Sequence, residues 1–395
     1  MSTTLHASAA ELVETVRRIA VEVAGPAAEN VDREARFPAE TFDALKKARI
    51  LSANVPVELG GAGATNVELE RMCEALGQRC ASSAMILAMH FGQVAAICRH
   101  RGTGAFFKQY LLELVSQQRL VASSTSEAGV GGATRTSVCA VERAADGCKL
   151  RKDATVISYV ESADDILITA RRAPDAKPSD QVAVLVRKTQ CRLEKTGTWD
   201  TLGMRGTASP AFIIDAVFPE EQVLPDSFAE ISSKTLAPTA HILWSATWLG
   251  LATDALARAR AFARTAAQKN PTVMSPLGPR LSEVSAVLQT FRAHVRDFAG
   301  HYDELLRSSD GGESELSSSG FTVQLVHLKT ASSLQAVEVV TSAMRIAGIM
   351  AYKNDSPFSI GRHLRDAHSA ALMMSNERMH VGSGPLHLYY RDEAL

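Results

Sequence analysis

Hydrophobic residues recur at helical spacing near both ends of the 395-residue chain. Residues 9–23 are rich in Ala, Glu, Val and Arg at this spacing, and Phe42 shares a helix face with Leu45. Residues 244–259 and 321–348 carry apolar side chains three or four positions apart, which predicts two further long helices. We therefore expect a helical region at each end of the chain.

Between these regions the pattern changes to short β-branched segments that turn residues separate. Because no helical pattern lies between the segments, they are typical of a compact β domain and not of alternating strands and helices. The predicted strands are residues 137–141, 155–159, 166–170, 182–186 and 211–214. Residues 308–320, rich in Ser, Gly and Glu, are expected to form a mobile surface loop.

The predicted fold class is therefore α+β, with three domains in sequence. Residues 1–118 form an N-terminal helical domain, residues 119–231 a central β-barrel, and residues 232–395 a C-terminal four-helix bundle.

Composition excludes several classes of partner. The formal net charge is −1, so the chain has no basic field that would attract nucleic acid or a membrane surface. We find neither a signal-peptide pattern nor an apolar stretch of about 18 residues, and expect no membrane span. The six cysteines lack metal-ligand spacing, which argues against a metal site and favours reduced thiols in a cytoplasmic protein.

Two glycine-containing stretches are candidates for ligand contact. Residues 124–132 read STSEAGVGG, and such a mixture of hydroxyls and glycines lets backbone N–H groups approach a polar ligand closely. The spacing is not that of a dinucleotide-binding loop, and taken alone the stretch is more typical of an ordinary turn. Residues 202–209 read LGMRGTAS and by themselves predict only a tight turn before a strand.

Taken together and in order, five motifs resemble those of the acyl-CoA dehydrogenase flavoprotein family. They are FP, VP and GGAG within residues 37–63, SEAGVGG at 126–132, a Lys-to-Ser segment followed by AD within 152–164, LGMRG at 202–206, and LRDA at 364–367. The second motif departs from the family pattern T-E-P-G-x-G-S, and Ser158 replaces a threonine. The resemblance covers almost the whole chain and implies the three-domain fold above, assembled as a homodimer or homotetramer.

The same resemblance implies a flavin, normally FAD, between the β domain and the C-terminal helices. The residues that it assigns to the flavin and its pyrophosphate are Thr125, Ser126, Gly131, Gly132 and Ser158. Gly348 stands where the family has a Gly-Gly pair that packs on the FAD of a neighbouring subunit. The family's R-x-x-F-G stretch is not recognisable here, so FMN remains an alternative to FAD.

The base that this family uses for dehydrogenation is missing from its usual position. α,β-Dehydrogenation of an acyl thioester needs a carboxylate that takes the α-proton, and a thioether cannot accept a proton. The expected position, eight residues after the Asp of R-D-A, holds Met374 in this chain. The position that other family members use, on the central helix, holds Ala240 beside His241.

Three interpretations of this substitution remain open. Glu377 could act as the base if its segment is helical, although a solvated glutamate beside Arg378 is the more ordinary interpretation. The protein could instead activate oxygen, as monooxygenase and N-hydroxylase branches of the superfamily do without the glutamate. His90 would then be a candidate near the flavin, against the ordinary interpretation of a structural histidine. In the third interpretation, catalysis is lost and the protein only binds acyl groups.

The leading prediction is an FAD-dependent oxidoreductase that dehydrogenates an acyl-CoA or another acyl thioester. A flavin-dependent monooxygenase is the alternative. The expected protein partner is an electron-transfer protein in the first case and a flavin reductase in the second.

Overall fold

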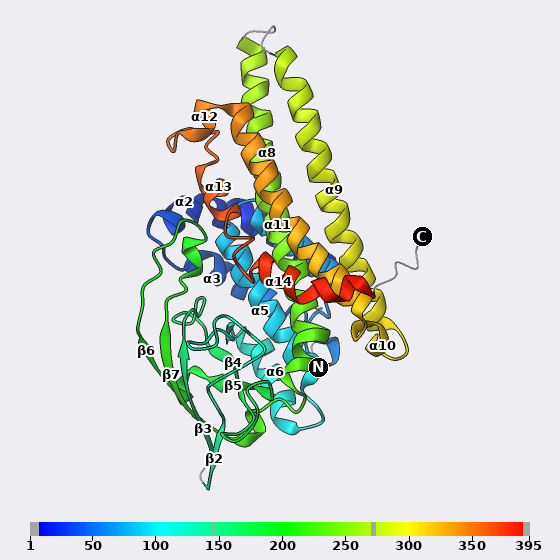
Figure 1. The fold of residues 1–395 in the computed structure, drawn as a ribbon. Coiled ribbons are helices and arrows are strands. Elements are labelled where there is room, and N and C mark those ends of the chain that lie inside the picture. Colours follow the sequence, from blue (N-terminus) through cyan, green and yellow to red (C-terminus); the bar gives the residue numbers. More distant parts are fainter. Residues whose placement is uncertain (1–7, 146, 270–273, 390–395) are drawn as a thin grey trace.

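Helices occupy both ends of the chain and strands occupy its middle (Figure 1). The computed structural model describes residues 8–145, 147–269 and 274–389. The predicted α+β class and the order of its parts are confirmed. The N-terminal helices are α1 (Ala9–Ile19), α2 (Gly25–Arg33), α3 (Ala39–Lys47), α4 (Asn66–Gly77), α5 (Ala81–His100) and α6 (Ala105–Gln117).

Local sequence determines where two of these helices begin. At the start of α1, the Glu11 N–H donates to the Ser8 hydroxyl, and the Ser8 N–H donates to the Glu11 carboxylate at 2.7 Å. Thr65 and Glu68 repeat this reciprocal arrangement at the start of α4. Each pair satisfies N–H groups that the first turn of a helix leaves without partners.

Among the described residues, α5 is the one helix that is long and apolar enough to cross a membrane by length and composition. In this fold 83% of its apolar window is buried. A central helix of a globular fold has the same properties, so this helix is weak evidence for a membrane span.

The strands are hydrogen-bonded as two sheets, where the sequence predicts a barrel. One sheet has the order β1-β4-β5, with β1 parallel to β4 and β4 antiparallel to β5. The other is antiparallel and has the order β2-β3-β7-β6. The strands are β1 (Val121–Ser124), β2 (Glu142–Ala144), β3 (Gly147–Ala154), β4 (Asp165–Arg171), β5 (Gln181–Arg187), β6 (Cys191–Lys195) and β7 (Phe212–Phe218).

Two predicted strands are wrong. Residues 155–159 end in the left-handed conformation of Tyr159 (φ 44°), which no β-ladder accommodates. The N–H groups of Ile157 and Tyr159 donate to carbonyl oxygens of residues 207–210 instead. Residues 137–141 contribute one isolated bridge, between Ala140 and Arg171. The other three predicted segments overlap β4, β5 and β7.

Long helices dominate the C-terminal region. α8 and α9 form an antiparallel pair that extends beyond the rest of the molecule, and α11 packs along α8 (Figure 1). The helices of this region are α7 (Phe228–Ile231), α8 (Ala237–Lys269), α9 (Met274–Arg307), α10 (Glu313–Leu316), α11 (Ser319–Ala347), α12 (Ile349–Tyr352), α13 (Gly361–Ala367) and α14 (Asn376–Ser383). The sequence analysis names no helix at α9, and the segment that it expects to be a loop contains α10.

One hydrophobic core runs through all three regions. Its buried members include Phe42 and Phe91 from the N-terminal helices, Ile168 from β4, and Trp248 and Phe291 from the C-terminal helices. Because the regions share this core, residues from each can be held in a fixed geometry at their junction.

Helices α4 and α8 cross closely because a glycine on each helix, Gly77 and Gly250, stands at the crossing. A Cβ on Gly250 of α8 would lie 2.2 Å from the Glu74 carbonyl oxygen of α4, and one on Gly77 would lie 2.6 Å from the Thr247 carbonyl oxygen. The two backbones are therefore in direct contact.

We expect Gly250→Ala to lower the free energy of unfolding by about 1–3 kcal/mol, because the added methyl group forces α4 and α8 apart. Gly300→Ala on α9 is the control, since no atom lies within 4 Å of its Cβ position. Alanine there should raise stability by about 0.5–1 kcal/mol. Urea unfolding followed by circular dichroism measures both changes, and equal effects at the two positions would contradict the close crossing.

Candidate functional site

A buried ion pair anchors the glycine-containing stretch that the sequence singles out. Lys152 Nζ of β3 lies 3.7 Å from Glu127 Oε2, and both side chains are buried. The ammonium also donates to the carbonyl and hydroxyl oxygens of Thr169 on β4, at 2.7 and 2.9 Å. Burial lowers the pKa of Lys152 because its charged form loses hydration, and the Glu127 carboxylate opposes this shift. The ion pair thus joins the stretch to two strands.

The Glu127 carboxylate also closes the stretch into a loop. Its Oε2 accepts the Ser137 hydroxyl proton at 2.6 Å, and its Oε1 accepts the N–H groups of Val138 and Cys139. We call residues 124–139 the glycine loop. One buried side chain therefore fixes both ends of this loop.

The backbone of the glycine loop is open to a ligand. Gly131 and Gly132 have φ values of 57° and 79°, a conformation that glycine adopts without strain. No atom lies within 4 Å of the position of a Cβ on Gly131. A Cβ on Gly132 would lie 1.9 Å from Arg378 Nη1, so the Arg378 guanidinium of α14 packs directly on the bare backbone. Backbone N–H groups in such a turn, together with a guanidinium, suit a phosphate.

Two of the predicted flavin residues are brought together beside this loop. The Ser126 hydroxyl donates to the Val156 carbonyl oxygen at 2.7 Å and accepts the Val156 N–H at 3.1 Å. Ser158 follows two residues later, and its hydroxyl lies 2.9 Å from Ser209 Oγ. Thr125, which precedes Ser126 in the same loop, is partly buried.

The LGMRG and LRDA motifs form a joint between the β region and α13. A Cβ on Gly203 would lie 2.2 Å from the Arg365 carbonyl oxygen, and the Met204 N–H donates to Asp366 Oδ1 at 2.6 Å. Burial raises the pKa of Asp366 to about 6. Both motifs therefore act by positioning the C-terminal segment against the β region.

The turn that contains Met374 lies between this joint and α14. Met374 has φ 51°, and its side chain is 42% exposed. The buried Lys329 ammonium of α11 donates to the Met374 carbonyl oxygen at 2.8 Å and to Asn376 Oδ1 at 2.7 Å. Burial lowers the pKa of Lys329 to about 8. The turn is thus held through its backbone and not through its side chain.

Glu377 is exposed in the first turn of α14. Consecutive helical residues point about 100° apart, so Glu377 and its neighbour Arg378 face different directions. Because Arg378 faces Gly132, Glu377 faces a different side of α14. Its role as the base stays a prediction.

His90 has a structural role in this geometry. Its side chain is fully buried; Nδ1 accepts the Val121 N–H at 3.1 Å, and Nε2 therefore carries the proton and donates to the Leu51 carbonyl oxygen at 2.7 Å. Burial lowers its pKa to about 4, so the ring is neutral near pH 7. With both nitrogens bonded to backbone, neither is free to transfer a proton, and the predicted role near the flavin is not supported.

The second family position for a base also lacks a carboxylate. Ala240 lies on α8 beside His241, whose ring is buried and whose Nδ1 has no hydrogen-bond partner among the described residues. Burial, with the Lys329 charge nearby, lowers the pKa of His241 to about 3. A histidine this difficult to protonate is a poor proton acceptor.

Gly348 ends α11 with φ 57°, and no atom lies within 4 Å of its Cβ position. This open backbone is compatible with a packing role. Its predicted contact with the flavin of a neighbouring subunit stays a prediction.

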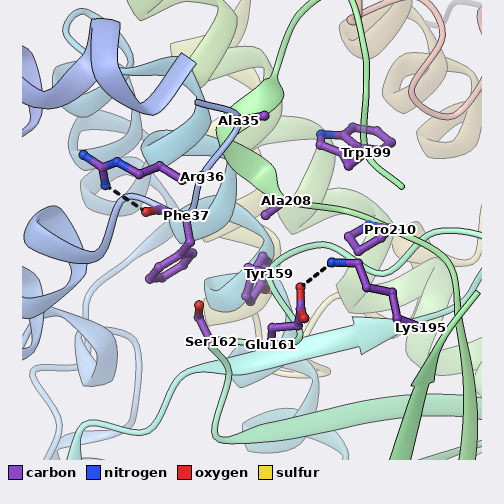
Figure 2. A pocket seen from close by; sticks show the side chains of 10 residues that line it. All are labelled: Ala35, Arg36, Phe37, Tyr159, Glu161, Ser162, Lys195, Trp199, Ala208 and Pro210. Carbon is purple, nitrogen blue, oxygen red and sulfur yellow. Dashed lines mark hydrogen bonds and ion pairs between the residues drawn. The ribbon is translucent and has the colours of Figure 1, made fainter. Parts of the chain in front are cut away.

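A cavity of about 250 Å³ opens beside the Ser158–Ser209 contact. Figure 2 shows its lining, in which Phe37 comes from the N-terminal region and Tyr159, Trp199 and Ala208 come from the β region. Tyr159 follows Ser158 directly, so the cavity reaches the segment that carries this predicted flavin residue.

Comparison with known proteins identifies the family. Residues 7–118 match "Acyl-CoA dehydrogenase, N-terminal domain", and residues 235–379 match "Acyl-CoA dehydrogenase, C-terminal domain". The chain belongs to the acyl-CoA dehydrogenase family.

Its relatives span several reaction classes. Amino sugar nitrososynthase DnmZ from Streptomyces peucetius is 24% identical over 349 residues, which cover 87% of this chain and 84% of that protein. Short-chain specific acyl-CoA dehydrogenase from Bos taurus is 25% identical over 361 residues, covering 90% and 84%. FMN-bound TdsC from Paenibacillus sp. A11-2, a dibenzothiophene monooxygenase, superposes with a TM-score of 0.83 at 18% identity, covering 96% of this chain and 98% of that chain. At this identity the likeness shows the fold alone.

The cofactor of this chain is a flavin, of which FAD is the form typical of the family. The residues present fit it. Gly131 leaves open space, Arg378 would offer a cation to a phosphate, and Ser158 would offer a hydroxyl to the ring system. The sequence analysis does not single out Arg378, because its approach to Gly132 joins positions 246 residues apart, as 378 minus 132 gives.

We expect Gly131→Val to weaken flavin binding by about tenfold or more, equivalent to about 1.4 kcal/mol. Valine at a left-handed position is strained, and its side chain would fill the space that the loop leaves open. Gly311→Val is the control, because Gly311 has a similar φ of 63° outside the glycine loop. Flavin fluorescence titration measures both, and unchanged affinity in Gly131→Val would mean that the loop does not contact the flavin.

We expect Lys152→Met to lower the free energy of unfolding by about 3–5 kcal/mol, because it leaves the buried Glu127 charge without a partner. The double variant Lys152→Met/Glu127→Gln should recover much of this loss, since it removes the uncompensated charge. Arg151→Met is the control, because the neighbouring Arg151–Asp215 ion pair is exposed and should contribute less than about 1 kcal/mol. Urea unfolding of the flavin-free proteins measures all three.

Proposed function

We propose that this chain is a flavin-dependent oxygenase, which inserts oxygen from O₂ into a small organic substrate, and not an acyl-CoA dehydrogenase. The observation that carries the proposal is the residue at position 374. Met374 stands on the turn where the family has its base, and a thioether cannot take a proton. His90 and His241 are buried and resist protonation, and Glu377 faces a different side of α14 from Arg378.

The surroundings of Met374 support a site without a base. The nearest charged group beneath the turn is the Lys329 ammonium, which donates to the Met374 carbonyl oxygen. Since this contact uses the backbone, the turn keeps its position whatever side chain residue 374 carries. A change from Glu to Met therefore removes the base and preserves the architecture around the flavin.

The bound flavin supplies the electrons that reduce oxygen. The chain's own residues bind and orient it: the glycine loop and Arg378 hold its phosphate, and Ser158 offers a hydroxyl to its ring. Met374 places an apolar side chain where the family has its carboxylate. A flavin reductase that delivers reduced flavin is the partner that this chemistry requires.

Relatives support the proposal without deciding it. A nitrososynthase and a monooxygenase occur among the similar proteins, and both names describe the addition of oxygen to a substrate. The second candidate is dehydrogenation of an acyl thioester with Glu377 as the base and an electron-transfer protein as the acceptor. The matches to both acyl-CoA dehydrogenase domains and the bovine relative favour it.

One experiment separates the two candidates. The flavin-loaded protein is mixed anaerobically with butyryl-CoA, octanoyl-CoA and palmitoyl-CoA while the flavin absorbance is followed. The oxygenase proposal expects no bleaching with any thioester, and oxygen uptake once NADH, a flavin reductase and an oxidisable substrate are supplied. Bleaching by a thioester would overturn the proposal in favour of dehydrogenation.

We expect Met374→Glu to create or raise acyl-CoA dehydrogenation, because a positioned general base contributes about 10²–10⁴-fold in rate. Met373→Glu is the control, since it adds a carboxylate one position away. If Glu377 is the working base instead, the wild type is active, Glu377→Gln abolishes the activity, and Met374→Glu adds nothing. Anaerobic flavin reduction rates distinguish these outcomes.

A further inference from the structure

A chain of three hydroxyl groups leads inward from Ser158. Ser209 Oγ lies 2.9 Å from Ser158 Oγ and 2.9 Å from Thr207 Oγ1. Thr207 Oγ1 in turn lies 2.8 Å from the carbonyl oxygen of Met204. Ser209 and Thr207 are only 2% and 3% exposed, whereas Ser158 is half-buried. Only the outer end of this hydroxyl chain can therefore meet a ligand.

The hydroxyl chain can be ordered in two directions, because each hydroxyl donates one proton and accepts through its lone pairs. In the outward order, Thr207 donates to Ser209, Ser209 donates to Ser158, and Ser158 donates to the ligand. In the inward order, Ser158 accepts from the ligand and donates to Ser209, Ser209 donates to Thr207, and Thr207 donates to the Met204 carbonyl oxygen.

Both orders satisfy every hydroxyl proton. The Met204 carbonyl oxygen does not depend on Thr207 Oγ1 in the outward order, because it also accepts the Trp199 indole N–H at 3.3 Å and the Thr207 N–H at 3.1 Å. The hydroxyl chain can therefore reverse without leaving a buried donor unpaired.

Two residues with a strained backbone lie next to this hydroxyl chain. Tyr159 and Ala208, which adjoin Ser158 and Ser209, have φ values of 44° and 42° although neither is glycine. The Tyr159 N–H bonds to the Thr207 and Ala208 carbonyl oxygens at 2.9 and 3.1 Å and so holds the two segments together. Both residues line the cavity in Figure 2. Strained residues of this kind persist where the surrounding structure maintains them for a function.

We propose that this hydroxyl chain is a reversible relay that adapts the hydrogen bond at Ser158 to the redox state of the flavin, with Ser209 as its positioning residue. The inference rests on the proposed function and takes the proposed flavin contact of Ser158 to be with nitrogen N5 of the ring. Reduction places a hydrogen on nitrogen N5 of the flavin ring and so converts a hydrogen-bond acceptor into a donor. The outward order serves the oxidised ring, and the inward order serves the reduced ring.

Removing the Ser209 hydroxyl should affect the two redox states unequally. Facing the oxidised ring, Ser158 still donates its proton to the flavin and loses only a donor to its own oxygen. Facing the reduced ring, the Ser158 proton has no protein acceptor, and an unpaired donor that the bound ring covers is the more costly defect. The reduced state is therefore destabilised, and the reduction potential falls.

The test measures flavin affinity and midpoint potential separately in Ser209→Ala, by fluorescence titration and by spectroelectrochemical titration against a reference dye. We expect a nearly unchanged dissociation constant for the oxidised flavin and a loss of about tenfold in the reduction equilibrium, which is about 30 mV for a two-electron couple. Ser209→Thr, which keeps the hydroxyl, should restore the wild-type potential. Thr207→Val should lower the potential in the same direction but by less, because the Ser209 hydroxyl can still donate to the Thr207 carbonyl oxygen at 3.3 Å. It provides a second test if Ser209→Ala does not fold.

Thr201→Val is the matched control, because its hydroxyl bonds to the Gly203 carbonyl oxygen in the same loop but outside the relay. An unchanged potential in Ser209→Ala and Thr207→Val overturns the relay, and so does an equal shift in Thr201→Val. Weaker flavin binding with an unchanged potential also overturns it, because Ser209 would then act in binding alone. Failure of the wild-type protein to take up flavin is a separate result, which overturns the proposed function itself.

Discussion

The site depends first on one buried ion pair, Lys152 with Glu127. Two charges removed from water are costly unless each finds its partner and its remaining hydrogen bonds, and both do so here. Lys152 on β3 donates a hydrogen bond to Thr169 on β4. The Glu127 carboxylate accepts the N–H groups of Val138 and Cys139, and these bonds close the glycine loop. The open backbone at Gly131 is therefore a consequence of a charge pair buried beneath it. Both residues belong to the family motifs, and their role in this structure is to hold the glycine loop in place.

A second constraint brings the C-terminal helices to this loop. The close contact of Gly203 with the Arg365 backbone and the bond from Met204 to Asp366 fix α13 on the β region. Lys329 then holds the turn at residue 374 by its carbonyl oxygen. Each of these contacts uses a backbone atom, so none of them depends on the Met374 side chain.

Much of the fold could be predicted from the sequence, and the failures have physical causes. The helical spacing at both ends of the chain and the β-branched segments between them are sufficient to predict the α+β class. The predicted strand at residues 155–159 is wrong because Tyr159 is held in the left-handed conformation by hydrogen bonds to Thr207 and Ala208, which lie 48 and 49 residues further along the chain. Helix α9 was overlooked although Val284, Leu288, Phe291 and Val295 carry a regular apolar spacing. That signal was present and could have been used.

The sequence by itself determined the motifs, the glycine positions and the absence of a carboxylate at residue 374, because these depend on residue type alone. Only the tertiary structure decided which side chains face the glycine loop. Arg378 reaches it and Glu377 does not, since neighbouring positions on one helix turn point apart. Both ring nitrogens of His90 are hydrogen-bonded to backbone groups of distant segments. Such contacts join residues far apart in the chain, so they cannot be predicted from a local sequence pattern.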